Sequence, residues 1–478
     1  MEHMKMKKMR IVFLSVLCLL IFGACRINGG GSTNRPSGSS AVNGGILADS
    51  GTGYSFMSYE GPLFPLTLKD SNSAITAERN TVFDFTDSQN HITDSYLLKN
   101  TSDSAQKVVF LYPFTASLSS RISERPAITI NGSAADAQMH IGPFSGAFSE
   151  IPGSDGGGPA LNISQITSWE GYKDLTEAGY MASAFDAFPD LQQNVVVYEV
   201  KDMYGERSEK APAPYINIEF NIDFSKTTVL SYGFSGCSLD EDTGYCSKGA
   251  FIPEGEAAAY SKSKYLIILG DDISDYKLGT YTNGGCDKAL DGAGASVVRY
   301  ECTLEEIFSE ACRLYLNYRN AFSGDDTETI SGEIPESVFA GLAAEVLCEY
   351  GALSKNPVAR YMSLEDLDWI FTDTLSMKRI IYLEFEAEIP AQETVTISAQ
   401  MLKPASFDYT GDTRNRRGYD MVTKLGSNIS FSAQTAEIMN CESVEITEQD
   451  FGFDPEKGIT SVSLDMDKPH NYIVVRLK

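Results

Sequence analysis

The stretch Ile216-Asn-Ile-Glu-Phe-Asn-Ile-Asp-Phe224 (INIEFNIDF) alternates apolar and polar residues from its first isoleucine to its last phenylalanine. Successive side chains of a β-strand point to opposite faces of a sheet, so a period of two predicts a strand with one buried and one exposed face. Strands of this kind are typical of antiparallel sheets that pack one face against a second layer. The stretch therefore predicts a mainly β fold.

Similar strand patterns occur on both sides of this stretch. They lie at residues 81–85, 92–98, 107–114, 128–130, 194–201, 265–269, 379–388 and 394–402, with four shorter runs between 428 and 477. Turn-forming residues follow several of them, at 99–104, 131–133, 240–244 and 389–393, and a strand, turn and strand in sequence predicts a hairpin. In architecture alone, the pattern resembles the β-sandwich modules common on bacterial surface proteins.

The apolar period changes from two to 3.6 between residues 303 and 378. Thr303 and Glu306 have the spacing of a capping box, Pro335 suits the first turn of a second helix, and Ser363 with Asp366 predicts the start of a third. The apolar stripes are of the kind that packs into a core. We therefore expect a mainly β, α+β fold of antiparallel β-sandwich modules with a helical insertion.

The N-terminus has the layout of a secretory signal. The basic stretch KMKKMR precedes an apolar run, residues 11–22, that is too short for a typical membrane-spanning helix. The run ends in Phe22-Gly-Ala-Cys25, which resembles the lipobox of bacterial lipoproteins. In that family the signal is cleaved before the cysteine, which carries lipid such as palmitate. The resemblance implies lipid attachment at Cys25 and a cell-membrane location on the extracytoplasmic face.

The composition then divides the rest of the chain. Residues 26–45 are rich in Gly, Ser and Asn and predict a flexible tether with almost nothing apolar to bury. The expected organisation is a signal peptide (1–24), a tether (25–45), an N-terminal β-sandwich-like domain with a short helix near Thr167 (46–205), a β-hairpin region (206–302), a helical subdomain (303–378) and a C-terminal β-region (379–478).

The charge balance is strongly acidic, with a formal net charge of -27. Nucleic-acid binding needs clustered Lys and Arg, so we expect no nucleic-acid partner. One basic cluster stands out: Arg414, Arg416 and Arg417 lie between Gly411 and Gly418 and form a candidate anion-contact loop. The alternative is an ordinary solvated loop, or one whose arginines pair with neighbouring acids.

Seven cysteines remain if the signal is removed and Cys25 is lipidated. Outside the cytoplasm they can pair, and the sequence-near candidates are Cys237 with Cys246 and Cys286 with Cys302. The alternative, in an anaerobic compartment, is that all seven stay reduced. No CxxC occurs and histidines are few, so no zinc site is expected.

The stretch Tyr265-Leu-Ile-Ile-Leu-Gly-Asp-Asp272 joins an apolar run to two carboxylates, with Asp275 close behind. A strand that delivers aspartates to its end can hold a metal ion, so Asp271, Asp272 and Asp275 are weak metal-ligand candidates. Gly and Asp are equally favoured in turns, and with no second carboxylate motif nearby the turn is the preferred interpretation.

The sequence contains no GxSxG, HExxH or GxxxxGK[ST] motif, and no cofactor is expected. We therefore expect a membrane-anchored surface lipoprotein that binds, scaffolds or senses an envelope protein or glycan. One alternative is a tethered carboxylate-dependent hydrolase, acting on glycans or assisted by a metal, because two suitably placed acids need no fixed spacing in sequence. A further alternative is a solute-capturing lipoprotein, a class that usually has two α/β lobes with parallel sheets.

Overall fold

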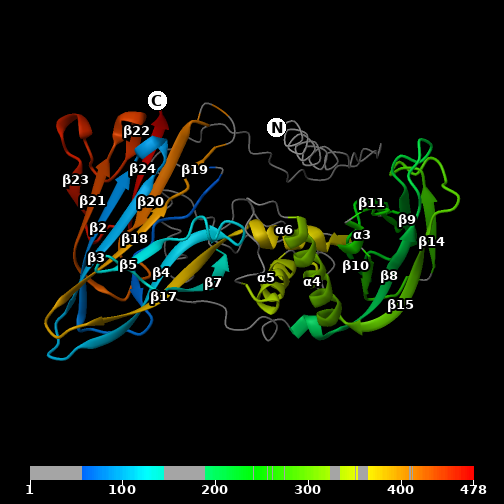
Figure 1. The fold of residues 1–478 in the computed structure, drawn as a ribbon, viewed down its shortest axis with the longest axis horizontal. Coiled ribbons are helices and arrows are strands. Elements are labelled where there is room, and N and C mark those ends of the chain that lie inside the picture. The colour runs from blue at the N-terminus through cyan, green and yellow to red at the C-terminus, as the bar shows by residue number, and fades with distance from the viewer. Residues whose placement is uncertain are drawn as a thin grey trace, which may run out of the picture. The chain divides into compact units, whose positions relative to one another are not determined.

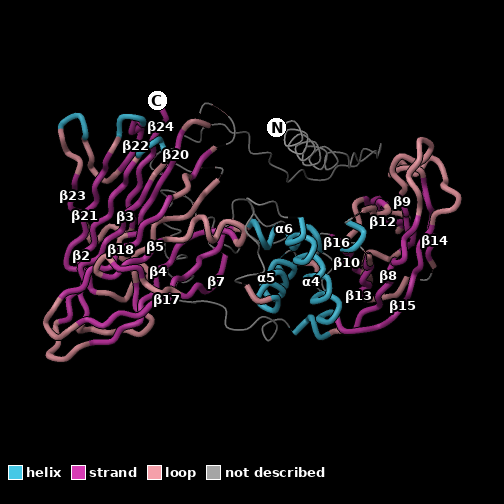
Figure 2. Tube along the Cα trace, in the orientation of Figure 1, coloured by secondary structure: helices cyan, strands magenta, loops and turns pink. Residues whose placement is uncertain are grey.

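The computed structural model describes residues 56–144, 189–322, 334–353 and 364–478, apart from residues 57, 241, 256, 261, 274, 350, 409, 410 and 412. Cys25, the predicted signal and tether, and the predicted helix near Thr167 lie outside these ranges. The chain divides into compact units Met1–Ala48 and Asp49–Lys478, and every described residue belongs to the second. About half of the described residues are in strands, which form mainly antiparallel sheets (Figure 1, Figure 2), and this confirms the mainly β fold class. Within these ranges, no helix is long and apolar enough to span a membrane.

The first sandwich packs a seven-stranded sheet against two four-stranded sheets. The large sheet has the order β23-β21-β2-β3-β18-β5-β6, and the smaller sheets have the orders β1-β4-β17-β7 and β19-β20-β24-β22. The strands are β1 Thr67–Leu68, β2 Ile75–Asp84, β3 His91–Asn100, β4 Gln106–Ser117, β5 Ala127–Ile130, β6 Ser133–Ala134, β7 Gln138–Phe144, β17 Lys378–Ile389, β18 Thr394–Leu402, β19 Ser406–Phe407, β20 Arg416–Val422, β21 Ser430–Met439, β22 Val444–Gln449, β23 Ser461–Ser463 and β24 His470–Leu477.

This sandwich is built from both ends of the described chain. β2 pairs with β21 in parallel, and β4 pairs with β17 along its whole length. The regions that composition assigns to an N-terminal domain (46–205) and a C-terminal β-region (379–478) therefore contribute strands to the same sheets. Local composition shows where strands lie but carries no signal for which distant strand each one pairs with.

The turns at 99–104 and 389–393 are not hairpins, contrary to the sequence prediction. β3 and β18 lie in the large sheet, whereas β4 and β17 lie in a smaller one, so each turn crosses between facing sheets. The two crossings are joined, because the Gln392 N–H donates to the Ser102 carbonyl at 3.2 Å and Asn100 Nδ2 donates to the Ile389 carbonyl at 3.0 Å. A polar turn between two strands has the same local sequence in either arrangement.

The turn at 240–244 joins a hairpin, as predicted, and the predicted turn at 131–133 also joins one. β5 pairs with β6 through Asn131 and Gly132, and β11 pairs with β12. Gly132 and Gly244 have φ of 81° and 75°, a left-handed conformation that glycine adopts without strain.

The second sandwich has one sheet of order β15-β8-β13-β10-β16 and one of order β11-β12-β9-β14. The strands are β8 Asn194–Tyr204, β9 Tyr215–Asn221, β10 Thr228–Tyr232, β11 Gly236–Asp240, β12 Tyr245–Phe251, β13 Lys264–Leu269, β14 Tyr276–Tyr281, β15 Gly294–Thr303 and β16 Leu364–Asp366. This sandwich and its helices connect β7 to β17 of the first sandwich (Figure 1).

Residues 216–221 of the INIEFNIDF stretch lie in β9, whereas residues 222–224 lie beyond its end, and one face of the strand is buried as predicted. Ile216, Ile218 and Phe220 are buried in the core between the two sheets. The opposite face is less exposed to solvent than predicted, because Tyr215 is only 5% exposed. Its ring lies against the backbone of the neighbouring strands, where a Cβ at Gly236 or Gly249 would come within 2.1 Å of the Tyr215 hydroxyl. Glycines on those strands thus allow the aromatic ring to cover part of the outer face.

The apolar run of YLIILGDD lies in β13, a central strand that is buried on both faces. Leu266 and Ile268 pack in the core between the two sheets, whereas Tyr265, Ile267 and Leu269 pack in the core that includes the helices. A strand covered on both sides needs apolar residues at every position, which explains why this run does not alternate.

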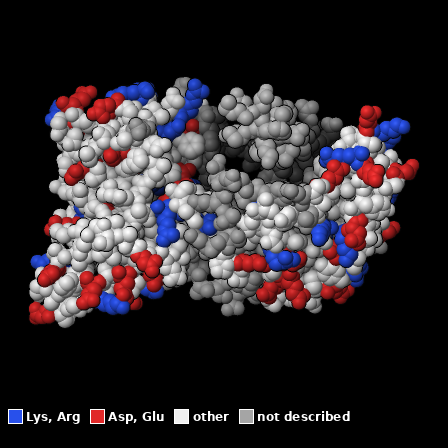
Figure 3. Space-filling view, viewed as in Figure 1, with Lys and Arg blue, Asp and Glu red and all other residues white. Residues whose placement is uncertain are grey.

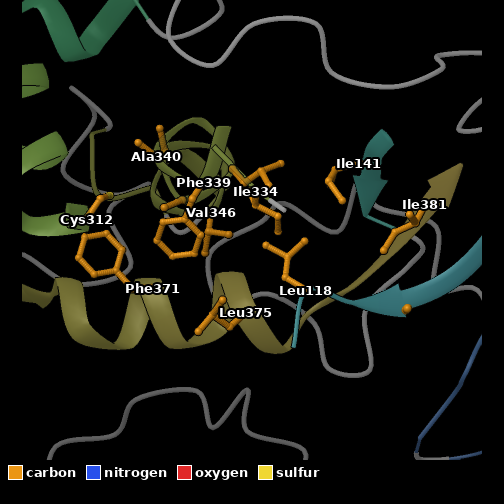
Figure 4. Packing of buried hydrophobic residues seen from close by; sticks show 14 of the residues in the cluster. Leu118, Ile141, Cys312, Ile334, Phe339, Ala340, Val346, Phe371, Leu375 and Ile381 are labelled. Carbon is orange, nitrogen blue, oxygen red and sulfur yellow. The ribbon is translucent and has the colours of Figure 1, made fainter. Parts of the chain in front are cut away.

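The helical insertion contains α4 Leu304–Phe322, α5 Glu336–Glu349 and α6 Leu367–Ser376, with the short helix α3 Ala257–Tyr260 nearby in the chain. The capping box is present, because the Thr303 N–H donates to Glu306 Oε2 at 3.0 Å and the Glu306 N–H donates to Thr303 Oγ1 at 3.3 Å. Figure 4 shows Phe371 and Leu375 on α6 close to residues of α5 in the shared core. The predicted start of the third helix is early: residues 364–366 pair with β10, and Asp366 caps α6.

A fully buried ion pair lies inside the first sandwich. Arg79 on β2 and Asp94 on β3 have no exposed side-chain surface, and Arg79 Nε lies 2.8 Å from Asp94 Oδ1. Asp94 also accepts the hydroxyls of Tyr96 at 2.5 Å and Tyr112 at 3.1 Å. Arg79 donates to the carbonyls of Phe64 and Val422, at 3.3 Å and 2.7 Å. The pair therefore joins the large sheet to β4 and β20, one strand in each smaller sheet.

Asp94→Asn should lower the free energy of unfolding by about 3–5 kcal/mol, because it leaves the buried Arg79 charge without its counter-charge. Urea unfolding followed by circular dichroism measures the change. Glu386→Gln is the control, since Glu386 pairs with Lys107 at 2.7 Å where the two side chains are 48% and 69% exposed. An exposed pair contributes about 0–1 kcal/mol. Equal losses in the two variants would contradict the role given to the buried pair.

Candidate functional site

The predicted anion-contact loop lies at one end of the sheet β19-β20-β24-β22. Arg416 and Arg417 begin β20, and Arg414 stands in the turn before it. The register places Arg416 directly opposite Arg476 on β24. We name Arg414, Arg416, Arg417 and Arg476 the arginine face. Arg476 is 60 residues away in sequence, so the local charge pattern could not have included it.

The arginines differ in how they are held. The Arg417 guanidinium lies 5.5 Å from the centroid of the Phe407 ring, and Nη1 donates to the Arg414 carbonyl at 3.0 Å. Arg476 lies 2.7 Å from Glu445, and both side chains are 52% exposed. Arg414 is exposed. Packing on Phe407 and the carbonyl contacts orient Arg417 without supplying a counter-charge. Its planar guanidinium group is therefore suited to bidentate hydrogen bonding with a phosphate or carboxylate.

The basic side chains of this end are visible as a blue strip beside β19 and β20 in Figure 3, on a surface where acidic side chains are otherwise frequent. Within the arginine face, Arg476 pairs with the acidic Glu445. The arrangement can bind an extended anionic surface, because its guanidinium groups lie on adjacent strands rather than around a closed pocket.

The three aspartates that are candidate metal ligands each contact different groups of the protein. Asp272 accepts the Tyr198 hydroxyl and Arg299 Nε, each at 3.0 Å. Asp275 accepts the backbone N–H of Tyr276 at 2.8 Å, whereas Asp271 accepts the Thr227 hydroxyl through its backbone carbonyl at 2.9 Å. Among the residues that the structure describes, no three His, Cys, Asp or Glu side chains are grouped to hold a metal ion. The turn after β13 links the two sheets of the second sandwich.

The cysteine positions differ from simple cross-strand pairing. Cys237 lies opposite Lys248 and Cys246 lies opposite Leu239, so these two cysteines are diagonal rather than direct neighbours. Cys302 lies on β15, whereas Cys286 follows β14 of the other sheet. Neither proposed disulfide is present among the described residues. Both stay predictions about the oxidised protein.

A second chemical cluster, which sequence reasoning missed, lies where β16 meets α6. Asp366 Oδ1 accepts the Asp368 N–H at 3.1 Å, and Asp368 Oδ2 accepts the Gly233 N–H at 2.6 Å. Lys248, on the inner face of β12, has its Nζ 3.9 Å from Asp366 Oδ2. Lys264 packs so closely that a Cβ at Gly233 would lie 2.8 Å from its Cδ. We name Asp366, Asp368, Lys248 and Lys264 the carboxylate–lysine cluster.

Burial shifts the protonation of this cluster. Burial, together with the adjacent Asp366, raises the pKa of Asp368 to about 8. Burial also raises the pKa of Asp366 and lowers the pKa of Lys264 to about 8. In sequence, Asp366-Leu-Asp368 has the ordinary appearance of a helix start, and both lysines are distant, so nothing local indicates the cluster.

Two concave features of the described residues differ in size and shape. A cavity of about 10 Å³ lies beside Thr115, Glu124 and Lys403, which is room for about one water molecule. An open depression of about 320 Å³ is lined by residues that include Lys201, Asp202, Lys262 and Ser263. Neither contains the arginine face or the carboxylate–lysine cluster.

No protein-family model matches the sequence, and no curated protein matches it.

Asp368→Asn should stabilise the protein increasingly between pH 5 and pH 8. The raised pKa of Asp368 means that its stabilising contribution is complete below about pH 4, the ordinary range of an aspartate, and is lost as the pH rises through 8. The asparagine cannot ionise, so it avoids this loss. Urea unfolding at pH 5, 6, 7 and 8 measures the difference between variant and wild type.

The series stops at pH 8 because the lowered pKa of Lys264 adds a change of opposite sign above that value. Asp103→Asn, at an exposed turn of the first sandwich, controls for the loss of one carboxylate. A difference for Asp368→Asn that stays constant across the series would show that burial does not disfavour its charged form.

Proposed function

We propose that this protein is a lipoprotein, anchored through Cys25 to the extracytoplasmic face of the cell membrane, with a binding or scaffolding role in the cell envelope. The observation that carries the proposal is Phe22-Gly-Ala-Cys25 directly after a basic stretch and a short apolar run. Two acyl chains on one cysteine anchor a protein stably, whereas a single chain does so only marginally.

The fold supports a binding role. Two sandwiches built of mainly antiparallel strands present broad sheet faces and sheet ends, and the arginine face lies at one such end. A surface of this type suits an extended anionic partner better than a small enclosed substrate, because small ligands are usually held in concave sites.

Two observations bear on the alternative functions. The carboxylate–lysine cluster is the feature that favours a carboxylate-dependent hydrolase, since it contains two acids with raised pKa values. A solute-capturing lipoprotein would have parallel sheets in two α/β lobes, whereas among the described strands the parallel pairs are β2 with β21 and β10 with β16. The sheet topology thus favours the binding or scaffolding role over solute capture.

Cys25→Ala should abolish lipid incorporation, because the cysteine sulfur is the acceptor of the lipid. Metabolic labelling with radioactive palmitate, followed by partition between detergent and aqueous phases, measures the result. Cys18→Ala is the matched control, since Cys18 lies within the apolar run and should not affect labelling. If the Cys25→Ala protein still incorporates palmitate, the proposed anchor is wrong.

A further inference from the structure

The first described residues of the chain lie beside the arginine face. Ser58 and Phe407 exchange two backbone hydrogen bonds of 2.9 Å, and Phe407 pairs with Arg417. Phe56 packs over Gly418, where a Cβ would lie 2.1 Å from the phenyl ring. Ser58 runs antiparallel to Phe407, so the chain comes into the sandwich from the end of the sheet that carries the arginines.

Exposed apolar side chains accompany the arginines at this end. Leu477 follows Arg476 at the end of β24 and is 37% exposed, and Met439 at the end of β21 is 48% exposed. Residues 441–443 follow β21 and lie next to the C-terminus, since the Lys478 N–H donates to the Ser443 carbonyl at 3.1 Å. Basic side chains next to exposed apolar ones are typical of surfaces that lie at a lipid–water interface.

The opposite end of the same sandwich is acidic. Asp103, Glu388 and Glu393 are exposed at the two crossings that join β3 to β4 and β17 to β18, where red side chains gather in Figure 3. β2 runs from that end to the other, and a ten-residue strand separates them by roughly 30 Å. At physiological salt, charges are screened beyond about 8 Å, so an anionic surface in contact with the arginines would not repel the acidic end.

We propose that the arginine face is the membrane-facing surface of this protein and contacts the phosphates of anionic phospholipid headgroups. This inference rests on the proposed lipid attachment at Cys25. Thirty residues separate Cys25 from Phe56, and a chain with the composition of residues 26–45 spans on the order of 30 Å. That length lets the arginine face reach the headgroups. The short tether also raises the effective concentration of the surface to the order of mM, enough to populate a contact too weak to hold a free protein.

The overall charge of -27 explains why one defined face is needed. An acidic protein held near an anionic bilayer is repelled in most orientations, and the arginine face offers an orientation in which charge-assisted contacts replace that repulsion. Each arginine near an anionic leaflet strengthens the contact by roughly fivefold. Loss of three arginines should therefore weaken it by about a hundredfold.

Neutron reflectometry on a supported bilayer tests the proposal. The chain from residue 26 onward, which retains the whole compact unit Asp49–Lys478, is tethered by an N-terminal hexahistidine tag to a chelating lipid. This tether replaces the native anchor, so the result does not depend on lipidation of Cys25. The measured quantity is the water layer between headgroups and protein, on bilayers of phosphatidylcholine alone and with 30% phosphatidylglycerol.

The expected result is that the water layer closes for the wild type on the anionic bilayer and reopens in 0.5 M NaCl. Arg414→Gln/Arg416→Gln/Arg417→Gln should leave it open, as should the milder Arg414→Gln/Arg476→Gln if the triple variant does not fold. The control Lys210→Gln/Lys262→Gln/Lys288→Gln removes the same charge from exposed positions of the second sandwich. Its water layer on the anionic bilayer should close as it does for the wild type.

The proposal would be overturned if the wild type had equal water layers on the two bilayers. It would also be overturned if the water layer on the anionic bilayer closed for both arginine variants. An open layer on the anionic bilayer together with uptake of soluble polyphosphate by the tethered wild type would also overturn it and assign the face to a soluble polyanion. The separate palmitate experiment decides whether Cys25 carries the anchor, so failure of one proposal is distinguishable from failure of the other.

Discussion

The first sandwich depends on the buried pair of Arg79 and Asp94. A buried charge is costly unless it is fully hydrogen-bonded, and here the carboxylate accepts from Arg79, Thr81, Tyr96 and Tyr112, while the guanidinium also donates to carbonyls of two segments outside its own sheet. These bonds can all form only if β2, β3, β4 and β20 are in register with one another. The pair therefore contributes less as a source of net stability than as a constraint on which arrangement of three sheets is allowed.

The sequence predicts much of the secondary structure and little of the pairing. The period of two in INIEFNIDF, the capping box at Thr303 and the glycine turn before Tyr245 are local signals, and the structure has β9, α4 and the β11–β12 hairpin at these positions. The turns near Asn100 and Pro390 show the limit, because a crossing between facing sheets and a hairpin need the same residues. The parallel pairing of β2 with β21 joins segments some 350 residues apart, and no local pattern specifies it.

The arginine face was only partly predictable, because local sequence patterns do not specify the pairing of distant strands. Arg414, Arg416 and Arg417 are adjacent in sequence, so their charge was visible, whereas Arg476 joins them through the register of β20 with β24. The carboxylate–lysine cluster was not visible at all. Its acids occupy an ordinary helix start, and the lysines come from two strands more than a hundred residues earlier. Sites assembled from distant strands become apparent when the topology is known, because burial and charge interactions arise from packing rather than from spacing.

The insertion of the second sandwich between β7 and β17 has a consequence for the order of folding. A chain made from its N-terminus produces β2, β3 and β4 long before β17, β18 and β21, so each of these early strands lacks one of its two neighbouring strands until the last hundred residues appear. The inserted strands pair among themselves over much shorter separations and pay less loop-closure entropy. We expect the insertion to fold first and bring the two halves of the outer sandwich together. Until then, the unpaired edges of β2 to β4 are the part of the nascent protein most in need of protection from aggregation.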